Sequence, residues 1–420
     1  MQEFLDKYKW FMEDLNKAEK DVKRKVLNGL RLVKKNYYPQ EERKADVTNL
    51  INCALCPNMC RFDCGTLQAS QKESMSPAYK SKIGYYLTMG KIDPSKSENK
   101  EFINLMYKCT NEENCKIWCP FDFSVVSLLE TVRDDLNKKG LMPDYCKEQI
   151  DKLNSSNTIE EYNIFETYKE KGIENIETDG SDEVYYYIGC EMMKFPSVVK
   201  ANIEILKKAG VKFSTNLDQK ICCGGPAFNI RDLETAKNFA QKNKELIENT
   251  GAKLVVSDCP GCVLTLIKRY NNVDVELDVK VVHIVEYIAN LLKEGKINPT
   301  KNIGISKLTI HDPCLIARNL KDNNSIREVL NSIPNLEIFE PMYNKEEVHC
   351  CGWSGTAHWA DRELAIREAQ NRIKELKETK TNNIISACPL CELGLNYGIT
   401  NEDKEKIKIF DISELLIKSL

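Results

Sequence analysis

The chain has 420 residues, with 60 basic and 63 acidic side chains and a formal net charge of −3. This near balance argues against nucleic acid as the main partner, because nucleic-acid-binding domains usually carry a concentrated basic surplus. The N-terminal residues are too charged for a signal peptide, and no stretch approaches the roughly 18 apolar residues of a membrane helix. We therefore expect a cytoplasmic protein with no direct membrane span, which could attach to a membrane only through a partner.

Residues 1–45 are predicted to form a charged N-terminal helical region. Apolar side chains recur there at helical spacing, namely Phe4, Leu5, Tyr8, Phe11, Met12 and Leu15. We expect this stripe to pack against the rest of the protein, and a helix that docks a partner is the alternative.

Residues 46–140 contain two runs of cysteines and few convincing strands. The first run, CALCPNMCRFDC, covers residues 53–64, and the second, CTNEENCKIWCP, covers residues 109–120. A bacterial ferredoxin run has the spacing Cys-x2-Cys-x2-Cys-x3-Cys-Pro, and its fourth cysteine binds the other of two clusters. The first run has one extra residue before Cys60, and in the second run Glu112 stands where a cysteine belongs.

The crossed ligand pattern of ferredoxins predicts one complete cubane cluster and one incomplete set of ligands. The complete set consists of Cys53, Cys56, Cys60 and Cys119. The second set consists of Cys64, Cys109 and Cys115. This second set could hold a [3Fe–4S] cluster, or a [4Fe–4S] cluster completed by Glu112, by water or, after rearrangement, by Cys146. Taken alone, Cys146 is interpreted as a buried thiol.

A linker and two similar modules are predicted to follow. Residues 141–180 are polar and acidic, which is typical of a surface linker. Residues 181–298 and residues 299–420, here called module 1 and module 2, repeat one order of strands, helices and cysteines. Corresponding cysteines lie 124 to 129 positions apart, so the repeat is a domain-sized duplication.

Each module is predicted to alternate strands with helices. In module 1 we expect strands at 184–188 and 254–256, helices at 196–209 and 232–248, and a helix that starts beside Cys262. In module 2 we expect strands at 308–310 and 384–385 and a helix at 362–378. The modules close on similar apolar segments at 282–286 and 410–414. This alternation indicates parallel sheets, and ligands at the carboxyl ends of such strands lie where open α/β sheets build their sites.

Ten of the eighteen cysteines form one pattern that occurs twice. In module 1 the pattern consists of Cys190, the pair Cys222 and Cys223, and Cys259-Pro-Gly-Cys262. In module 2 it consists of Cys314, the pair Cys350 and Cys351, and Cys388-Pro-Leu-Cys391. A Cys-Pro-x-Cys sequence after a strand places two thiolates at a helix N-terminus, where free N–H groups stabilise negative charge.

Five cysteines in one set favour an iron–sulfur cluster. Adjacent cysteines tend to point in different directions and can reach two irons of one cluster, but not easily one zinc ion. Zinc in at least one module stays an alternative, although zinc prefers four ligands, and a disulfide network is disfavoured by the expected compartment. The glycines that follow each pair, Gly224, Gly225 and Gly352, allow positive φ angles and close approach of the backbone to a cluster.

The duplicated pattern, with its ICCGGP and HCCGWSG segments, resembles the CCG (cysteine-rich) domains of heterodisulfide reductase catalytic subunits over roughly residues 181–420. In that family each CCG domain holds a noncubane [4Fe–4S] cluster through five cysteines, and the disulfide is cleaved between the two clusters. The resemblance implies that the five cysteines of each module are the ligands. The same domains occur, often with cysteines missing, in iron–sulfur subunits of glycolate, lactate and glycerol-3-phosphate dehydrogenases. The completeness of both sets here favours chemistry at the clusters themselves.

The N-terminal cysteine segment resembles the two-cluster ferredoxin domain that is fused ahead of the CCG modules in one-chain heterodisulfide reductases and in glycolate oxidase iron–sulfur subunits. The expected fold is therefore α/β, with two tandem Rossmann-like CCG modules behind a small helical ferredoxin-type domain. The expected cofactors are two noncubane clusters, one cubane [4Fe–4S] cluster and a second [4Fe–4S] or [3Fe–4S] cluster.

Several charged side chains near the cysteines are candidates for acid–base or binding roles. His349 precedes the pair of module 2, where it could protonate a nascent thiolate, and its counterpart in module 1 is an isoleucine. His311 is expected to hydrogen-bond the backbone near a strand end, and His283 is expected to be structural. Lys194 and Arg318 each follow the first cysteine of a module by four residues, and a solvated surface charge or an anion-binding role is expected for both.

The leading hypothesis is an iron–sulfur oxidoreductase that acts on sulfur groups and reduces a small disulfide. Its electrons would come from a redox partner protein, namely a flavoprotein, a ferredoxin-rich subunit or a cytochrome subunit. The alternative is an electron-relay subunit of a flavin-dependent 2-hydroxyacid (glycolate or lactate) or glycerol-3-phosphate dehydrogenase. A scaffold or cluster carrier is a third, non-enzymatic hypothesis. No G-x-G-x-x-G fingerprint occurs, so any flavin is expected on a partner chain.

Overall fold

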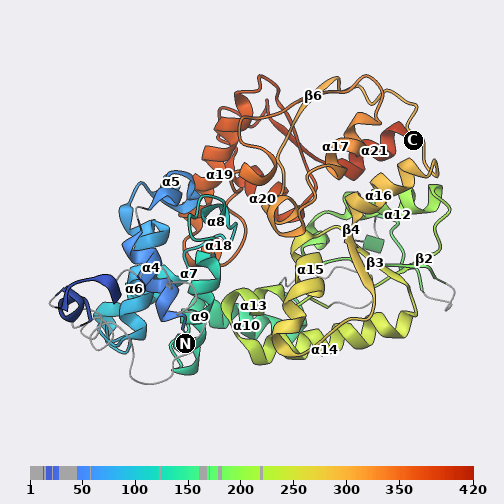
Figure 1. The fold of residues 1–420 in the computed structure, drawn as a ribbon. Helices are drawn as coiled ribbons and strands as arrows, with labels where there is room; N and C mark the ends of the chain where they lie inside the picture. The colour runs from blue at the N-terminus through green and yellow to red at the C-terminus, as the bar shows by residue number, and fades with distance from the viewer. Residues whose placement is uncertain are drawn as a thin grey trace.

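The structure is a computed structural model. It describes residues 13, 16–20, 22–27, 45–56, 58–122, 124–159, 168–169, 171–177, 182–217 and 221–420. The apolar stripe predicted within residues 1–45 lies outside the described residues, since all six of its members (Phe4, Leu5, Tyr8, Phe11, Met12 and Leu15) are outside them. The described chain comprises an N-terminal helical part and two α/β parts that lie against one another (Figure 1).

The N-terminal part is built from helices around a small apolar core. Its elements are α4 (Val47–Leu55), η1 (Met59–Asp63), α5 (Gly65–Ser70), η2 (Glu73–Met75), α6 (Pro77–Thr88), η3 (Ser97–Asn99), α7 (Lys100–Tyr107), α8 (Asn114–Ile117) and α9 (Val125–Lys138). Helix α4 packs against α6 and α9, and Leu50, Met106 and Leu129 are fully buried between them. The guanidinium of the fully buried Arg133 donates to Met106 O and to Asn229 O, both at 2.8 Å, which ties this part to module 1.

Module 1 is a parallel four-stranded sheet with helices around it. Its elements are β1 (Val184–Tyr186), η4 (Cys190–Lys194), α12 (Pro196–Lys208), β2 (Phe213–Thr215), α13 (Gly225–Ile230), α14 (Leu233–Thr250), β3 (Leu254–Ser257), α15 (Pro260–Leu264), η5 (Thr265–Arg269), η6 (Tyr270–Val273), β4 (Lys280–His283) and α16 (Ile284–Lys293). The strand order is β2-β1-β3-β4, and all neighbours are parallel.

Module 2 repeats this architecture. Its elements are β5 (Lys307–Ile310), η7 (Leu315–Leu320), α17 (Ser325–Asn331), β6 (Glu337–Phe339), η8 (Lys345–Glu347), α18 (Ala357–Ala360), α19 (Arg362–Lys377), β7 (Asn383–Ser386), α20 (Pro389–Gly398), β8 (Lys408–Asp411) and α21 (Ile412–Ser419). The order β6-β5-β7-β8 is again fully parallel. The predicted α/β fold with two parallel sheets is thus confirmed, although strands β2 and β6 were not among the predicted strands.

The sheet order explains where the cysteines lie. In each sheet the first and third strands are central neighbours, and the chain leaves them toward opposite edges, which defines a topological switch point. Cys190 follows β1 and Cys259 follows β3, so both lie at the carboxyl ends of these central strands. Cys314 and Cys388 occupy the same positions after β5 and β7. The topology therefore brings together cysteines that are far apart in the sequence.

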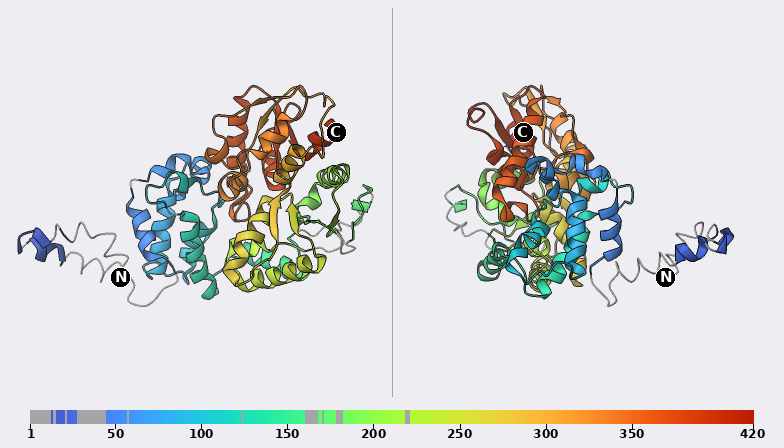
Figure 2. Two further views of the ribbon diagram at one scale, coloured as in Figure 1. Left: turned by 45° about the vertical axis from the view of Figure 1, so that its right-hand side comes forward. Right: turned by 90° about the vertical axis from the view of Figure 1, so that its left-hand side faces the viewer.

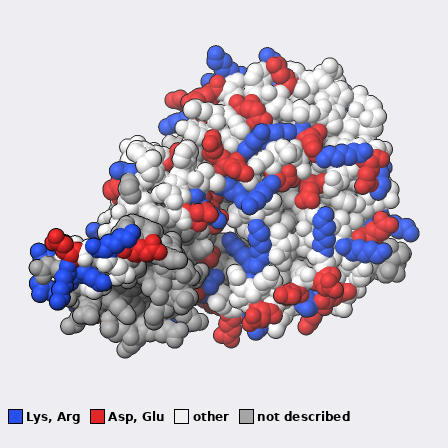
Figure 3. Space-filling view, in the orientation of Figure 1, with Lys and Arg blue, Asp and Glu red and all other residues white. Residues whose placement is uncertain are grey.

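The two modules share one apolar core, which fixes their relative position. Helix α12 packs against α21, and α16 packs against α17. Fully or almost fully buried side chains from both modules meet in this core, including Val199, Ile288, Leu330 and Leu416. The two views of Figure 2 show module 2 stacked on module 1, with the N-terminal helices alongside both. On the face shown in Figure 3, basic and acidic side chains are interspersed.

The segment predicted to be a linker, residues 141–180, contains a helix. Helix α10 spans Asp144–Ser156 and packs against α13 and α18. Its inner face consists of Cys146, Ile150 and Leu153, which are at most 7% exposed. This i, i+4, i+7 spacing is a helix signal that the polar composition of the segment concealed. Cys146 lies beside Arg133 in this core, as a buried thiol.

The described residues contain no helix whose length and apolar character would let it cross a membrane.

His283 and its repeat counterpart Asp411 have the same structural role, because each caps the N-terminus of the helix that follows it. His283 Nδ1 accepts a hydrogen bond from Val285 N at the start of α16, and Asp411 Oδ1 accepts one from Ser413 N at the start of α21. Side-chain acceptors at this position satisfy N–H groups that the helix leaves unpaired. The structural role expected for His283 is therefore confirmed.

Protonation of His283 should destabilise the protein. Burial lowers the pKa of His283 from 6.5 to about 4. The stability that depends on the neutral ring is therefore fully present above about pH 6.5 and is lost as the pH falls toward 4. Between pH 7 and about pH 5 this linkage amounts to about 2 kcal/mol. We expect His283→Asn, which keeps a capping acceptor, to remove this part of the acid sensitivity. Urea unfolding of both proteins at each pH measures it, and parallel stability–pH curves would contradict the assignment.

Candidate cluster-binding site

The five cysteines of module 1 form one buried set. Cys190 opens η4, the pair Cys222 and Cys223 precedes α13, and Cys259 and Cys262 lie in the first turn of α15. All five side chains are buried and none forms a disulfide. Cys190 Sγ lies 3.6 Å from Cys222 Sγ. All five line one cavity of about 80 Å³, so the structure assembles the set that the sequence predicts.

The cysteines of module 2 form an equivalent set. Cys314 precedes η7, Cys350 and Cys351 precede a turn at Gly352, and Cys388 and Cys391 lie at the start of α20. Their side chains are at most 4% exposed and form no disulfide. Cys351 Sγ lies 3.5 Å from Cys391 Sγ. Each module therefore offers five sulfur donors at one place.

Two of the three glycines next to the cysteine pairs, Gly224 and Gly352, have the positive φ angles that were predicted, whereas Gly225 does not. Gly224 and Gly352 have φ angles of 83° and 78°, which disfavour any residue with a side chain. Their N–H groups lie 3.4 and 3.3 Å from the sulfurs of Cys222 and Cys350. A Cβ on Gly352 would also lie 2.3 Å from Ala365 O. The backbone can therefore curl around the sulfur atoms and donate hydrogen bonds to them, which suits thiolates that bind a cluster.

The two cysteine sets face one another across the boundary between the modules. A hydrogen bond from Cys262 lowers the pKa of the Cys259 thiol, but burial and the charge of Cys388 raise it by more. Cys388 of module 2 therefore lies close enough to Cys259 of module 1 to affect its ionisation. Helix α15, which carries Cys262, packs against η7, which follows Cys314. The cavity next to the module 1 set is also lined by module 2 residues, among them Leu315, Trp353, His358 and Trp359.

The N-terminal cysteines also gather close to one another. Burial raises the pKa of Cys60 to about 12, and four neighbouring thiols add to this effect through their charge: Cys53, Cys64, Cys56 and Cys119. Burial raises the pKa of Cys115 as well, and the charges of Cys109 and Cys64 contribute. Thiols so strongly shifted stay protonated unless a metal supplies positive charge.

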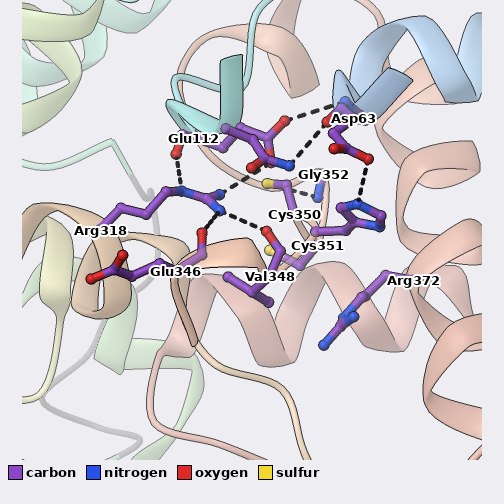
Figure 4. A network of polar contacts seen from close by, with 12 residues as sticks. Asp63, Glu112, Arg318, Glu346, Val348, Cys350, Cys351, Gly352 and Arg372 are labelled. Carbon is purple, nitrogen blue, oxygen red and sulfur yellow. Dashed lines mark hydrogen bonds and ion pairs between the residues drawn. The ribbon is translucent and has the colours of Figure 1, made fainter. Parts of the chain in front are cut away.

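Arg318 is buried and paired, so the surface or anion-binding role expected for it is wrong. Its Nε donates to Glu112 O at 2.6 Å, and its Nη1 donates to Val348 O at 2.7 Å and to Glu346 O at 2.9 Å (Figure 4). Its Nη2 lies 3.4 Å from Glu112 Oε2. The contact is a latch between the N-terminal part and module 2, and sequence spacing carries no signal for a partner 206 positions away.

Glu112, at the cysteine-like position of the second N-terminal run, lies between two cysteine sets. Its Oε1 accepts from Gly65 N at 3.2 Å, next to Cys64. Its carboxylate, Cys350 Sγ and the Glu368 carboxylate all lie within 4.8 Å of one another. Burial raises the pKa of Glu112, and Arg318 and His349 oppose that shift.

The histidines of module 2 differ from expectation in one case. His311 was expected to bond the backbone, but its Nδ1 accepts from Arg372 Nε at 3.1 Å, and the ring lies within 4.8 Å of Cys351 Sγ. His349 borders a cavity of about 410 Å³ that Cys350 also lines. Its Nδ1 lies 2.6 Å from Glu375 Oε1 and its Nε2 lies 3.5 Å from Asp63 Oδ1. Burial lowers the pKa of His349, but the contact with Glu375 raises it by more.

Sequence reasoning missed the aromatic residues that follow the second cysteine pair. Trp353, His358 and Trp359 reach across to the cavity of module 1. A signal was present, since two of the four tryptophans fall within eight residues of Cys351. Lys194, expected at the surface, is half-buried, pairs with Glu191 at 3.1 Å and lines a neighbouring cavity.

The comparisons with known proteins agree with this geometry. A family model described as "CCG: Cysteine-rich domain" matches residues 184–267 and 308–396. A subunit of the dihydromethanophenazine:CoB–CoM heterodisulfide reductase of Methanosarcina barkeri is 28% identical over 79% of this chain and 82% of its own length. The same protein of Methanosarcina acetivorans is 28% identical over 88% of this chain and 94% of its own. A subunit of the fumarate reductase (CoM/CoB) of Methanothermobacter marburgensis is 26% identical over 74% of this chain and 61% of its own length.

The chain therefore contains the CCG cysteine-rich domain twice. It is homologous to these heterodisulfide reductase subunits and to related iron–sulfur oxidoreductase subunits. Among solved structures, an aspartate racemase homologue from Pyrococcus horikoshii aligns at a TM-score of 0.25 and 16% identity, covering 56% of this chain and 96% of that one.

The latch between Arg318 and Glu112 should be essential for stability. Arg318→Met leaves a buried carboxylate without its cation, and breaking such a pair typically costs about 3–5 kcal/mol. We expect Arg318→Met to lower the unfolding temperature strongly, and Glu112→Gln to cost less. The double variant should be more stable than the sum of the two changes predicts, because the carboxylate that needs Arg318 is then absent. Thermal unfolding of the four proteins tests this, and simple additivity would contradict the latch.

Proposed function

We propose that the protein is the iron–sulfur subunit of an oxidoreductase that reduces a small disulfide at its two five-cysteine sets. The observation that carries the proposal is that both sets are complete, buried and placed at equivalent strand ends. When bound there, two noncubane [4Fe–4S] clusters would supply single electrons to the two sulfur atoms. The balanced reaction is R–S–S–R′ + 2 e⁻ + 2 H⁺ → RSH + R′SH. The names of the related heterodisulfide reductase subunits support this class of reaction.

The chain's own residues would position and protonate the substrate. The cavity beside the module 1 set lies between the modules, so its walls can hold a disulfide against the five cysteines of module 1 and exclude water. We assign to His349 the role of holding a proton beside Cys350, because Glu375 stabilises the charged form of its ring. His349 lines the cavity of about 410 Å³ and not the cavity between the modules, so this proton would serve the cysteine set of module 2.

The N-terminal cysteines are assigned to clusters that receive electrons. The proposed cubane ligands are Cys53, Cys56, Cys60 and Cys119. The proposed ligands of a second [4Fe–4S] or [3Fe–4S] cluster are Cys64, Cys109 and Cys115. The two runs carry five of the exposed large apolar side chains in the described chain, and a sixth directly follows the second run: Leu55, Met59, Phe62, Ile117, Trp118 and then Phe121. Aromatic residues and methionine are enriched in protein interfaces, which supports docking of a cytoplasmic or membrane-bound redox partner at this end.

A relay subunit of a flavin-dependent dehydrogenase is the second candidate function. The observation that favours it is that the cavity between the modules is lined by all five cysteines of module 1 and by none of module 2. In a relay, the module 2 set would pass electrons onward and would contact no substrate.

The ligand assignment predicts a defined loss of iron. We expect Cys223→Ser and Cys351→Ser each to lose one cluster, or about four iron atoms per chain, because each removes one of five ligands. Cys146→Ser is the matched control, since Cys146 is also buried but belongs to none of the assigned sets. Iron and acid-labile sulfide analysis of anaerobically purified protein measures the change. Equal iron in all three variants, or zinc in either module, would contradict the assignment.

The disulfide hypothesis and the relay hypothesis predict different activities. With reduced methyl viologen as donor, the protein should reduce a small disulfide, and Cys223→Ser and Cys351→Ser should each abolish this activity while Cys146→Ser retains it. Freeze-quench electron paramagnetic resonance should still show reduction of the N-terminal clusters in both inactive variants. A fully cluster-loaded protein that accepts electrons but reduces no disulfide would support the relay.

A further inference from the structure

A second, larger cavity adjoins the cysteine-lined cavity. Its volume is about 560 Å³, and it shares six lining residues with the first: Ile159, Glu191, Trp353, His358, Trp359 and Leu390. Three parts of the chain build it, namely α10, η4 and the segment of module 2 from Trp353 to Tyr397. A molecule that reaches the five cysteines of module 1 through this cavity must pass all three of these parts of the chain.

One wall of the second cavity is a stack of aromatic rings capped by a guanidinium. The Trp353 ring lies 4.6 Å from the Tyr397 ring and 5.7 Å from the His358 ring. The guanidinium of Arg362 lies 4.8 Å above the Tyr397 ring and 5.8 Å from the Trp353 ring. Stacking fixes the plane of the guanidinium and leaves its N–H edge available for hydrogen bonds, the arrangement that suits a carboxylate or a phosphate.

Among the described residues that line the second cavity, basic side chains outnumber acidic ones. The basic residues are Lys152, Lys194 and Arg362, and the acidic one, Glu191, pairs with Lys194 at 3.1 Å. Within the described chain no carboxylate lies within 4 Å of the Arg362 guanidinium. The acidic neighbours of Arg362 along the chain turn to other partners, because Asp361 pairs with Lys108 and Glu363 pairs with Arg367.

A polar atom on the boundary between the two cavities also lacks a partner. His358 lines both cavities, and its buried Nδ1 has no hydrogen-bond partner among the described residues. Burial lowers the pKa of His358 to about 4, and the nearby Lys194 and Arg362 act in the same direction. The ring is therefore neutral at physiological pH, and it can hydrogen-bond a ligand without adding charge.

We propose that this second cavity binds an anionic group of the substrate through Arg362, with the apolar part of the molecule against the Trp353–Tyr397 wall. The anion would then lie at the mouth, and the reacting sulfur atoms would lie in the inner cavity beside the module 1 cysteines. The reacting part of this inference rests on the proposed function, but the binding part does not. Arg362 is accordingly a specificity-determining residue.

The test compares two small disulfides that differ in charge. Isothermal titration calorimetry of the anaerobic, cluster-loaded full chain is performed with the dianion 3,3′-dithiodipropionate and with neutral bis(2-hydroxyethyl) disulfide. We expect the dianion to bind more tightly, and Arg362→Gln to weaken the dianion about tenfold while leaving the neutral compound unchanged, since a charge-assisted hydrogen bond is lost. Arg362→Lys should retain most of the affinity because it keeps the charge.

Arg367→Gln is the matched control, because Arg367 is an exposed arginine on the same helix that lines neither cavity. Equal binding of the two disulfides, or no effect of Arg362→Gln, would overturn the proposal. Inorganic phosphate that binds as tightly as the dianion would also overturn it, because the cavity would then be a plain anion site. Charge-selective binding without any reduction would leave this site standing and refute the disulfide reductase function. Reduction of both disulfides with equal KM would support the disulfide reductase function and refute the anion-binding site.

Discussion

The burial of ten thiol groups in two sets is the constraint on which the rest of the structure depends. Hydrogen bonds among neighbouring thiols, together with burial, raise the pKa of Cys222 and Cys262 far above the ordinary value. Five thiolates therefore cannot be ionised side by side unless positive charge lies between them. A bound iron–sulfur cluster would supply that charge. The glycine N–H groups at the sulfurs of Cys222 and Cys350 add donors on the protein side.

The shared core between the modules holds the two cysteine sets in a fixed relative position. Each sheet alone would place its cysteines at its own switch point, with no fixed relation to the other sheet. Because α12 and α16 pack on α21 and α17, the sheets cannot rotate independently without exposing side chains such as Val199 and Leu330. The set of module 1 thus stays opposite the set of module 2. The latch between Arg318 and Glu112 then holds the N-terminal cysteines against the same assembly.

The sequence predicted what depends on local chain geometry. Cysteines next to short apolar strands and to glycines indicated both sets and the turns at Gly224 and Gly352, and the alternation of strands with helices indicated the parallel sheets. It failed where a side chain's partner is distant in sequence. Arg318 resembled a surface cation because its partner Glu112 lies 206 positions away, and the His311 ring accepts from Arg372, 61 positions away, in place of bonding the backbone. Helix α10 was missed because its apolar face is only three residues wide.

The two modules have diverged at equivalent positions, and the differences divide their roles. Gly225 follows the pair of module 1, where a Cβ would lie 3.4 Å from Cys223 Sγ, whereas its counterpart Trp353 projects from module 2 into the cavity of module 1. Lys194 lines the adjoining second cavity, whereas its counterpart Arg318 is paired with Glu112. Module 1 thus carries its cysteines on the cavity, and module 2 supplies the cavity wall and the contact to the N-terminal part. A duplicated fold can in this way serve one asymmetric site, because the repeat fixes the cysteines and leaves the flanking residues free to change.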